Sequence, residues 1–182
     1  MTETTHILVT GGAGQVGLEL LRAAWPDGVM LHAPSRTELD LTSAASIRAA
    51  FEATPFAAVI NSAAWTAVDK AESEVAAAFS ANALGPALMA DATRAWGVPL
   101  IQVSTDYVFD GSGIAPWKET DATGPLSVYG RTKLEGEQLV ARHCAKHLIF
   151  RTSWVYAARG GNFAKTMLRL ARERDKLTVI DD

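Results

Sequence analysis

The sequence predicts an α/β fold built on a doubly wound parallel sheet. Short apolar runs recur along the chain and alternate with stretches whose apolar residues have helical spacing. In addition, a glycine-rich turn joins the first apolar run to the first helical stretch. Strands of a parallel sheet read as continuous apolar runs because helices cover both faces of the sheet. Right-handed crossovers then give the strand order 3-2-1-4-5-6.

The first half of the chain alternates strands and helices from its start. Strands are expected at residues 6–9, 29–33 and 57–60. The first helix follows the glycine-rich turn, and the Trp25-Pro26-Asp27-Gly28 sequence ends it. The second helix is expected to begin at a cap formed by Thr42 or Ser43 and to run to about residue 53.

The second half continues the alternation. Strands are expected at residues 100–104, 147–151 and 177–180. An alanine-rich stretch from about residue 68 to 95 is expected to be mostly helical, with an interruption near Gly85-Pro86. Residues 106–123 contain several glycines and a proline and are expected to form a loop, with helices following at 127–143 and 163–174.

The composition indicates one globular domain over residues 1–182. The chain has 48% hydrophobic and 20% charged residues, and its formal net charge is −3. No basic excess favours a nucleic-acid partner, and no apolar run is long enough to span a membrane. The N-terminus shows no signal-peptide pattern, and the single cysteine, Cys144, cannot form an internal disulfide. These features predict a cytoplasmic protein.

The glycine-rich turn covers Thr10–Gly17 and reads T-G-G-A-G-Q-V-G. Gly11, Gly14 and Gly17 have the spacing of a dinucleotide-binding Rossmann turn. Such glycines allow a tight turn, the approach of a pyrophosphate to backbone N–H groups, and close packing of helix on strand. The simpler alternative is a glycine-rich turn without a ligand, which the position between a strand and a helix disfavours.

Further cofactor contacts are expected where the next strands end, because ligands gather at the carboxyl ends of parallel strands. Arg36 follows the second strand, and no carboxylate stands immediately beside it to repel a 2′-phosphate. This favours NADPH over NADH. The alternative for Arg36 is a solvated loop cation. Asp40 and Leu41 could border an adenine, although Asp40 suits a turn equally well.

Tyr129 and Lys133 are four residues apart and therefore share one face of the expected helix. This pairing suits proton transfer to a carbonyl oxygen as a hydride reaches the carbon. A phenol has a reference pKa of about 10, which Lys133 and an oxidised nicotinamide could lower together. The hydroxyl of Thr105 would hold the carbonyl oxygen. The pattern Y-x-x-x-K is common by chance. The catalytic interpretation of this pair therefore depends on the glycine turn and on the Ser-Thr sequence that ends the fourth strand.

Several motifs resemble the extended short-chain dehydrogenases/reductases, and more narrowly the dTDP-4-dehydrorhamnose reductase family. They lie at Gly11–Gly17, Ala64–Glu74, Ser104–Gly111, Pro116–Asp121, Pro125–Glu137 and Arg151–Tyr156. The glycine motif is shared across the superfamily. The later motifs, such as S-T-D-Y-V-F-D-G and R-T-S-W-V-Y, are specific to the family.

The resemblance implies reduction of dTDP-4-dehydro-6-deoxy-L-mannose to dTDP-L-rhamnose with NADPH, or with NADH, as the reductant. It implies Thr105, Tyr129 and Lys133 as the catalytic set. It also implies cofactor contacts by Gln15, Val16, Asp40, Leu41, Ala63, Ala64 and Thr66. The substrate would lie near Asp106, Tyr107 and Trp154, although Trp154 could equally be a core aromatic.

Some members of this family use Mg²⁺ between subunits, and Glu19 is the matching candidate, although a solvated helix residue is the simpler interpretation. A homodimer is a further candidate assembly. Members also continue beyond the sixth strand into a substrate-binding lobe, which this chain is expected to lack.

Two alternative functions stay open. One is a related nucleotide-sugar epimerase or dehydratase, although the related dehydratases carry Thr-Asp-Glu where this chain has Thr105-Asp106-Tyr107. The other is a non-catalytic NADP-binding regulatory subunit on the same fold.

Overall fold

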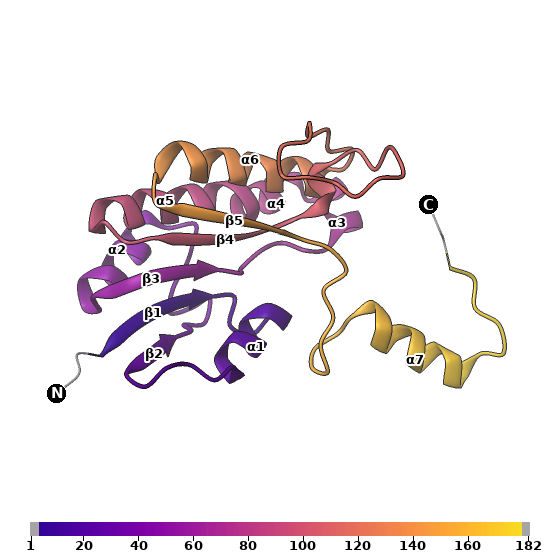
Figure 1. Ribbon diagram of the computed structural model, residues 1–182, viewed down its shortest axis with the longest axis horizontal. Helices are drawn as coiled ribbons and strands as arrows, with labels where there is room; N and C mark the ends of the chain where they lie inside the picture. The colour runs from indigo at the N-terminus through magenta and orange to yellow at the C-terminus, as the bar shows by residue number, and fades with distance from the viewer. Residues whose placement is uncertain (1–3, 180–182) are drawn as a thin grey trace.

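The computed structural model describes residues 4–179, which contain a parallel sheet of five strands. The strands are β1 (Thr5–Thr10), β2 (Val29–His32), β3 (Phe56–Asn61), β4 (Leu100–Thr105) and β5 (His147–Thr152). They follow the order β2-β1-β3-β4-β5 across the sheet, and each neighbouring pair is parallel (Figure 1). The predicted α/β class with a Rossmann-like parallel sheet is therefore confirmed.

The predicted strand order 3-2-1-4-5-6 is wrong around the first strand. The third strand, β3, pairs directly with β1, and no strand lies outside β2 in the part of the chain that the structure describes. Residues 33–43 follow β2 as turns and irregular structure. One of these turns is closed by the Glu38 carboxylate, which accepts hydrogen bonds from the N–H and hydroxyl of Ser35, both at 2.7 Å. The chain then continues through α2 (Ala44–Ala53) to β3, which pairs with β1 on the side away from β2.

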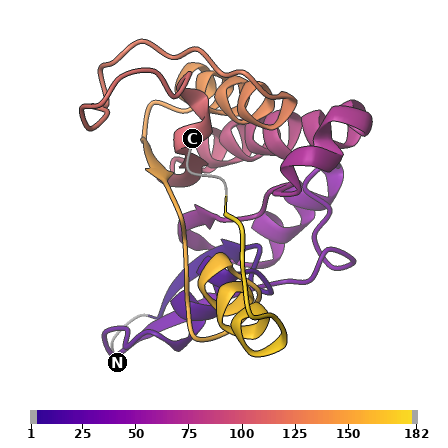
Figure 2. The same ribbon diagram turned by 90° about the vertical axis from the view of Figure 1, so that its right-hand side faces the viewer.

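The predicted sixth strand at residues 177–180 is not formed at residues 177–179, and Ile180 lies outside the described residues. The preceding helix, α7 (Phe163–Glu173), lies beyond the carboxyl ends of the strands (Figures 1 and 2). None of its residues is buried, and Phe163 and Leu168 are 44% and 66% exposed. Because α7 is not seated on the sheet, the residues that follow it do not run along the edge of β5.

Most helices cover one face of the sheet. There α2 (Ala44–Ala53), α5 (Gly85–Trp96) and α6 (Val128–His143) pack together, whereas α1 (Gln15–Arg22) lies on the opposite face (Figure 1). The buried core between sheet and helices includes Leu8, Ile47, Phe51, Val59, Met89, Leu100 and Val140. No helix among the described residues has both the length and the apolar character needed to cross a lipid bilayer.

Serine side chains fix where two of these helices begin. Ser43 accepts a hydrogen bond from the N–H of Ser46 and caps α2, which confirms one of the two predicted cap positions. Ser127 accepts from the N–H of Gly130 in the same way and caps α6. The cap on α6 matters for the site, because the candidate catalytic side chains lie in the first turns of this helix.

The predicted helix over residues 68–95 is divided differently from the expectation. It consists of α3 (Val68–Ser73), α4 (Val75–Phe79), a π-helical turn η1 (Ser80–Leu84) and α5. The α-helical pattern is interrupted by η1 directly before the predicted Gly85-Pro86 position and also, unexpectedly, at Glu74. Pro86 is tolerated because it stands in the first turn of α5. A Cβ on Gly136 of α6 would overlap the carbonyl oxygen of Asn82 in η1. The π turn and α6 can approach this closely only because residue 136 is glycine.

Candidate cofactor and catalytic site

The carboxyl ends of the strands border a pocket of about 660 Å³. Predicted site residues that line it are Gly11, Gly14, Gln15, Val16, Ala63, Ala64, Thr66, Thr105, Asp106, Tyr107, Tyr129, Lys133 and Trp154. They come from segments that are far apart in the sequence. A concave site of this size with a few convergent polar groups suits a cofactor or a small ligand.

The glycines of the turn have the conformations and close contacts that their spacing predicts. Gly11 has a φ of +74°, and a Cβ there would lie 2.6 Å from the backbone nitrogen of Ala63. A Cβ on Gly17 would overlap the carbonyl oxygen of Gly11, so glycine at 17 lets α1 start close to β1. Gln15 begins α1 and lines the pocket, which leaves the unpaired N–H groups of this first turn available to an anion.

A second pocket of about 520 Å³ adjoins the first and shares small residues of the glycine turn and of the segment after β3 with it. Arg36, Asp40 and Leu41, which were predicted to meet the adenosine end of a cofactor, line this second pocket. Together the two pockets form a continuous surface across the carboxyl ends of the strands. Such an elongated site has room for a dinucleotide.

The carboxylates near Arg36 are held by their own turns. Asp40 accepts hydrogen bonds from the N–H and hydroxyl of Thr42, at 2.9 and 2.7 Å, which hold the pKa of Asp40 below its usual value. The contacts with Ser35 lower the pKa of Glu38 in the same way. Asp40 shapes a turn and also borders the pocket, and its contact with an adenine stays a prediction. Glu38 does not line the second pocket, whereas Arg36 does.

Thr105, Tyr129 and Lys133 meet at the wall of the first pocket. Thr105 ends β4, the other two lie in the first turns of α6, and the three residues are 5%, 8% and 4% exposed. The Thr105 hydroxyl donates to Oδ1 of Asp106 at 3.1 Å and accepts from the N–H of Tyr107 at 3.2 Å. The rings of Tyr107 and Tyr129 meet edge to face, with centroids 5.5 Å apart.

Burial dominates the acid–base properties of this group. It raises the pKa of Tyr129, and Asp106 and Tyr107 add to the effect, while the Thr105 side chain partly opposes it. Burial also lowers the pKa of Lys133 to about 8, against an opposing effect of Glu137. The expected lowering of the Tyr129 pKa by Lys133 is not found in the protein alone. Tyr129 is therefore a protonated phenol at neutral pH, which is the form that a general acid needs.

A chain of buried polar side chains connects the strands to Lys133, and sequence reasoning missed it. Thr10 donates to Oδ1 of Asn61 at 2.5 Å, and Nδ2 of Asn61 donates to Oε1 of Gln102 at 2.7 Å. Nε2 of Gln102 and Nζ of Lys133 both donate to the carbonyl oxygen of Val103, at 2.9 and 2.7 Å. The available signal was the presence of Asn61 and Gln102 within otherwise apolar strands.

Trp154 lies on the pocket and not in the core. It is 72% exposed, and its φ of 51° is uncommon for a bulky side chain. Its ring contacts Phe163 edge to face, with centroids 5.0 Å apart. The alternative of a core aromatic is therefore wrong. An unusual backbone conformation at an exposed aromatic is consistent with a ligand contact.

The segment that follows β5 supplies pocket residues that the sequence reasoning did not identify. Val155, Gly160 and Gly161 line the first pocket, and Nδ2 of Asn162 donates to Oε1 of Gln15 at 3.1 Å. This contact brings the segment against the glycine turn, 147 positions earlier in the chain. No local sequence pattern predicts this long-range contact.

Glu19, the candidate Mg²⁺ ligand, forms an ion pair with Arg159. Its Oε1 lies 3.2 Å from Nη1 of Arg159, and both side chains are partly exposed. Among residues 4–179, no three His, Cys, Asp or Glu side chains gather into a possible metal site.

Residues 5–182 match the profile of the family described as the RmlD substrate binding domain. The chain belongs to this family. The dTDP-4-dehydrorhamnose reductases of Shigella flexneri and of Escherichia coli strain K12 are each 50% identical to it over 181 residues. These matches cover 97% of the chain, which spans 60% of the length of either relative.

Solved structures of the same family are similar over nearly the whole chain. The dTDP-4-dehydrorhamnose reductase of Bacillus anthracis in complex with NADP is 34% identical and has a TM-score of 0.92, covering 97% of this chain and 63% of that one. The ortholog from Clostridium acetobutylicum is 40% identical with a TM-score of 0.91, covering 95% and 61%. The family and its fold are therefore shown for this chain.

The lowered pKa of Lys133 predicts a pH-dependent contribution to stability. Between pH 8 and the usual lysine value of 10.5, the unfolded chain binds a proton that the folded chain has released. The free energy of unfolding of the wild type should therefore rise with pH in this window, by about 3 kcal/mol relative to Lys133→Met. Urea titrations of both proteins from pH 7 to 10.5 measure this difference. Parallel curves for the two proteins would contradict it.

Proposed function

We propose that the chain forms the cofactor-binding and catalytic part of a dTDP-4-dehydrorhamnose reductase. The substrate is dTDP-4-dehydro-6-deoxy-L-mannose, the product dTDP-L-rhamnose and the reductant NADPH. The observation that carries the proposal is the single pocket in which the glycine turn, Trp154 and the group Thr105, Tyr129 and Lys133 meet. The reductases that are 50% identical to the chain support the choice of substrate.

In this proposal residues 1–182 are the dinucleotide-binding domain. The chain spans 60% of the length of its relatives, and the part of them that it does not match would complete the sugar-nucleotide site. The proposal thus names the reaction in which these residues take part. Mg²⁺ is left out of it, because the Glu19 carboxylate is paired with Arg159.

The proton for the reduction comes from Tyr129. Bound NADPH supplies a hydride to C4 of the keto sugar. As negative charge develops on the C4 oxygen, the phenol of Tyr129 donates its proton there, and the ketone becomes a secondary alcohol. The raised pKa of Tyr129 keeps that proton in place at neutral pH. Lys133 is positively charged below about pH 8 and stabilises the phenolate that Tyr129 becomes when it gives up its proton.

The substrate oxygen is positioned by Thr105 and its neighbours. The Thr105 hydroxyl donates to Asp106, so it must turn toward the substrate to donate to the C4 oxygen. Ser153 donates to the other oxygen of Asp106 at 2.6 Å and would keep that carboxylate in place during this turn. Tyr107 and Trp154 border the same pocket and offer ring faces to the sugar nucleotide.

The alternative functions have less support. Elimination of water by a dehydratase needs a further acid or base, and Tyr107 occupies the position where the related dehydratases carry glutamate. A purely regulatory cofactor-binding subunit has no need for Thr105, Tyr129 and Lys133 to be buried together at one pocket wall. A reductase uses all three.

Tyr129→Phe should lower turnover by roughly 10²–10⁴-fold, because it removes the proton donor and keeps the ring. We would measure NADPH oxidation with the keto sugar nucleotide, in a chimera that continues this chain with the unmatched part of the Escherichia coli relative. NADPH affinity of the variant should stay within about threefold of the parent, since the hydroxyl alone is lost. An active parent chimera whose Tyr129→Phe form keeps full turnover would remove Tyr129 from the mechanism.

Arg36→Ala should weaken NADPH binding by about 1.5–3 kcal/mol and leave NADH binding nearly unchanged, because only NADPH carries the 2′-phosphate. Isothermal titration of the 182-residue chain with each cofactor measures both affinities. Arg48→Ala is the matched control, because Arg48 is an exposed arginine on α2 that lines neither pocket. Equal losses for NADPH and NADH would assign Arg36 a structural role instead.

A further inference from the structure

Glu137 is a buried carboxylate that the proposed mechanism does not use. It follows Tyr129 and Lys133 on α6 at steps of four residues, so the three side chains lie along one side of the helix. The residue is 5% exposed. Burial of an unpaired carboxylate is strongly unfavourable. Glu137 therefore needs a partner that compensates its charge.

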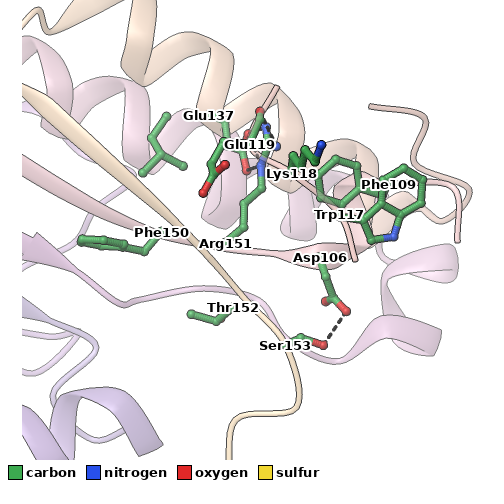
Figure 3. Close-up of a pocket in the computed structure, with 11 residues that line it drawn as sticks. Asp106, Phe109, Trp117, Lys118, Glu119, Glu137, Phe150, Arg151, Thr152 and Ser153 are labelled. Carbon is green, nitrogen blue, oxygen red and sulfur yellow. Dashed lines mark hydrogen bonds and ion pairs between the residues drawn. The ribbon is translucent and has the colours of Figure 1, made fainter. Parts of the chain in front are cut away.

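The partner is Arg151 on β5. Its Nε and Nη2 donate to the two carboxylate oxygens of Glu137 at 3.0 and 2.7 Å. Arg151 is also held from its other side, because its guanidinium carbon lies 5.0 Å from the ring centroid of Phe109 and its Nη1 donates to the carbonyl oxygen of Glu119 at 3.4 Å. Figure 3 shows this group around a further pocket, of about 550 Å³. A two-point hydrogen bond fixes the position of the negative charge on Glu137.

Stability alone is a weak reason for such a pair. Glu137 is buried and Arg151 is partly exposed, and removing such charges from water costs about as much free energy as their attraction returns. A charge held in a fixed position does, however, shift the pKa of ionisable groups near it. Lys133 is 4% exposed, its Nζ contacts the carbonyl of Val103, and Glu137 is the charge that opposes the effect of burial on its pKa.

Three other carboxylates around α6, those of Glu72, Asp91 and Asp106, have hydrogen-bond partners of their own. The titratable and charged groups on the elements packed against α6 and on the adjoining loop are Asp69, Lys70, Glu72, Asp91, Arg94, Asp106, Tyr107, Lys118, Glu119, His147 and Arg151. Asp106 accepts from Thr105 and Ser153, Glu72 accepts from the N–H of Val128, and Asp91 pairs with His143 at the far end of α6. Glu137 is thus the carboxylate on the same side of the helix as Lys133.

We infer that Glu137 and Arg151 form a positioning pair for Lys133. The Glu137 carboxylate favours the charged form of Lys133 beside Tyr129. Arg151 holds this carboxylate in place and partly neutralises its charge, which weakens its attraction for Lys133. The inference rests on the proposed function, because the charge of Lys133 matters there for proton donation by Tyr129. Neither Glu137 nor Arg151 touches the substrate in this account.

The pair can be tested by following the ionisation of Lys133 directly. The ¹³Cε chemical shift of Lys133, assigned with Lys133→Met, is titrated by NMR from pH 6 to 11 in the chain without cofactor. Glu137→Gln should lower the pKa of Lys133 from about 8 to roughly 7, because the opposite charge is lost. Arg151→Gln should raise it to roughly 9, because the Glu137 charge is no longer shared with a guanidinium group. These opposite directions are the signature of an electrostatic role.

Two further variants make the outcome decisive. Glu135→Gln removes the same charge from α6 two positions from Glu137, on another side of the helix, and should leave the pKa of Lys133 at about 8. Arg151→Lys keeps a cation beside Glu137 and should also leave the pKa of Lys133 near its parent value. It replaces Arg151→Gln in the comparison if that variant fails to fold. Shifts in the same direction for Glu137→Gln and Arg151→Gln, or no shift in either, would overturn the inference.

Failure of the proposed function would appear in a different measurement. The titrations need neither NADPH nor substrate, so a chain that binds no NADPH would contradict the proposed reductase and leave the Lys133 result readable. If NADPH does bind, its affinity should decline as pH rises through the pKa of Lys133. This decline should begin at a lower pH in Glu137→Gln than in Glu135→Gln.

Discussion

The carboxyl ends of the strands are tied together by one continuous chain of buried hydrogen bonds. It runs from Thr10 on β1 through Asn61 on β3 and Gln102 on β4 to the carbonyl of Val103, where Lys133 also donates. The side chains of Thr10, Asn61, Gln102 and Lys133 are buried, so each needs its partner, and leaving one unpaired costs about 1–3 kcal/mol. The chain keeps these strand ends and the catalytic helix in register. The glycine turn, Thr105 and Lys133 can therefore face one pocket.

Close contact between α6 and the π turn η1 provides the second constraint. Asn82 accepts from the N–H of Trp65 at 2.8 Å, and its Nδ2 donates to the Trp65 carbonyl and to the Thr132 hydroxyl, each at 3.1 Å. This single side chain connects the segment after β3, which borders the cofactor pockets, to the helix that carries Tyr129. Gly136 leaves the room that the contact requires. A π turn at this position agrees with the frequent occurrence of such turns near functional sites.

The features predicted correctly from the sequence are those set by local chemistry. The contacts of Gly11 and Gly17 follow from the absence of a side chain, and the presence of Tyr129 and Lys133 at one pocket wall follows from helical spacing. The errors concern features set by tertiary contacts. The order of the strands depends on which strands pair across the sheet, such as β1 with β3, and a sixth strand would need the residues after α7 to pair with β5. Ser153 and Asn82 reach their partners only after the chain has folded, so no spacing could identify them.

The central claim is that the two adjoining pockets hold one NADPH molecule along the carboxyl ends of the strands. A crystal structure of the 182-residue chain with NADPH tests this most directly. The account predicts the pyrophosphate against the backbone of Gly14 and Gln15, the 2′-phosphate within hydrogen-bond distance of Arg36, and the nicotinamide beside Tyr129 and Lys133. A cofactor bound elsewhere, or one whose nicotinamide lies away from Tyr129, would contradict the account.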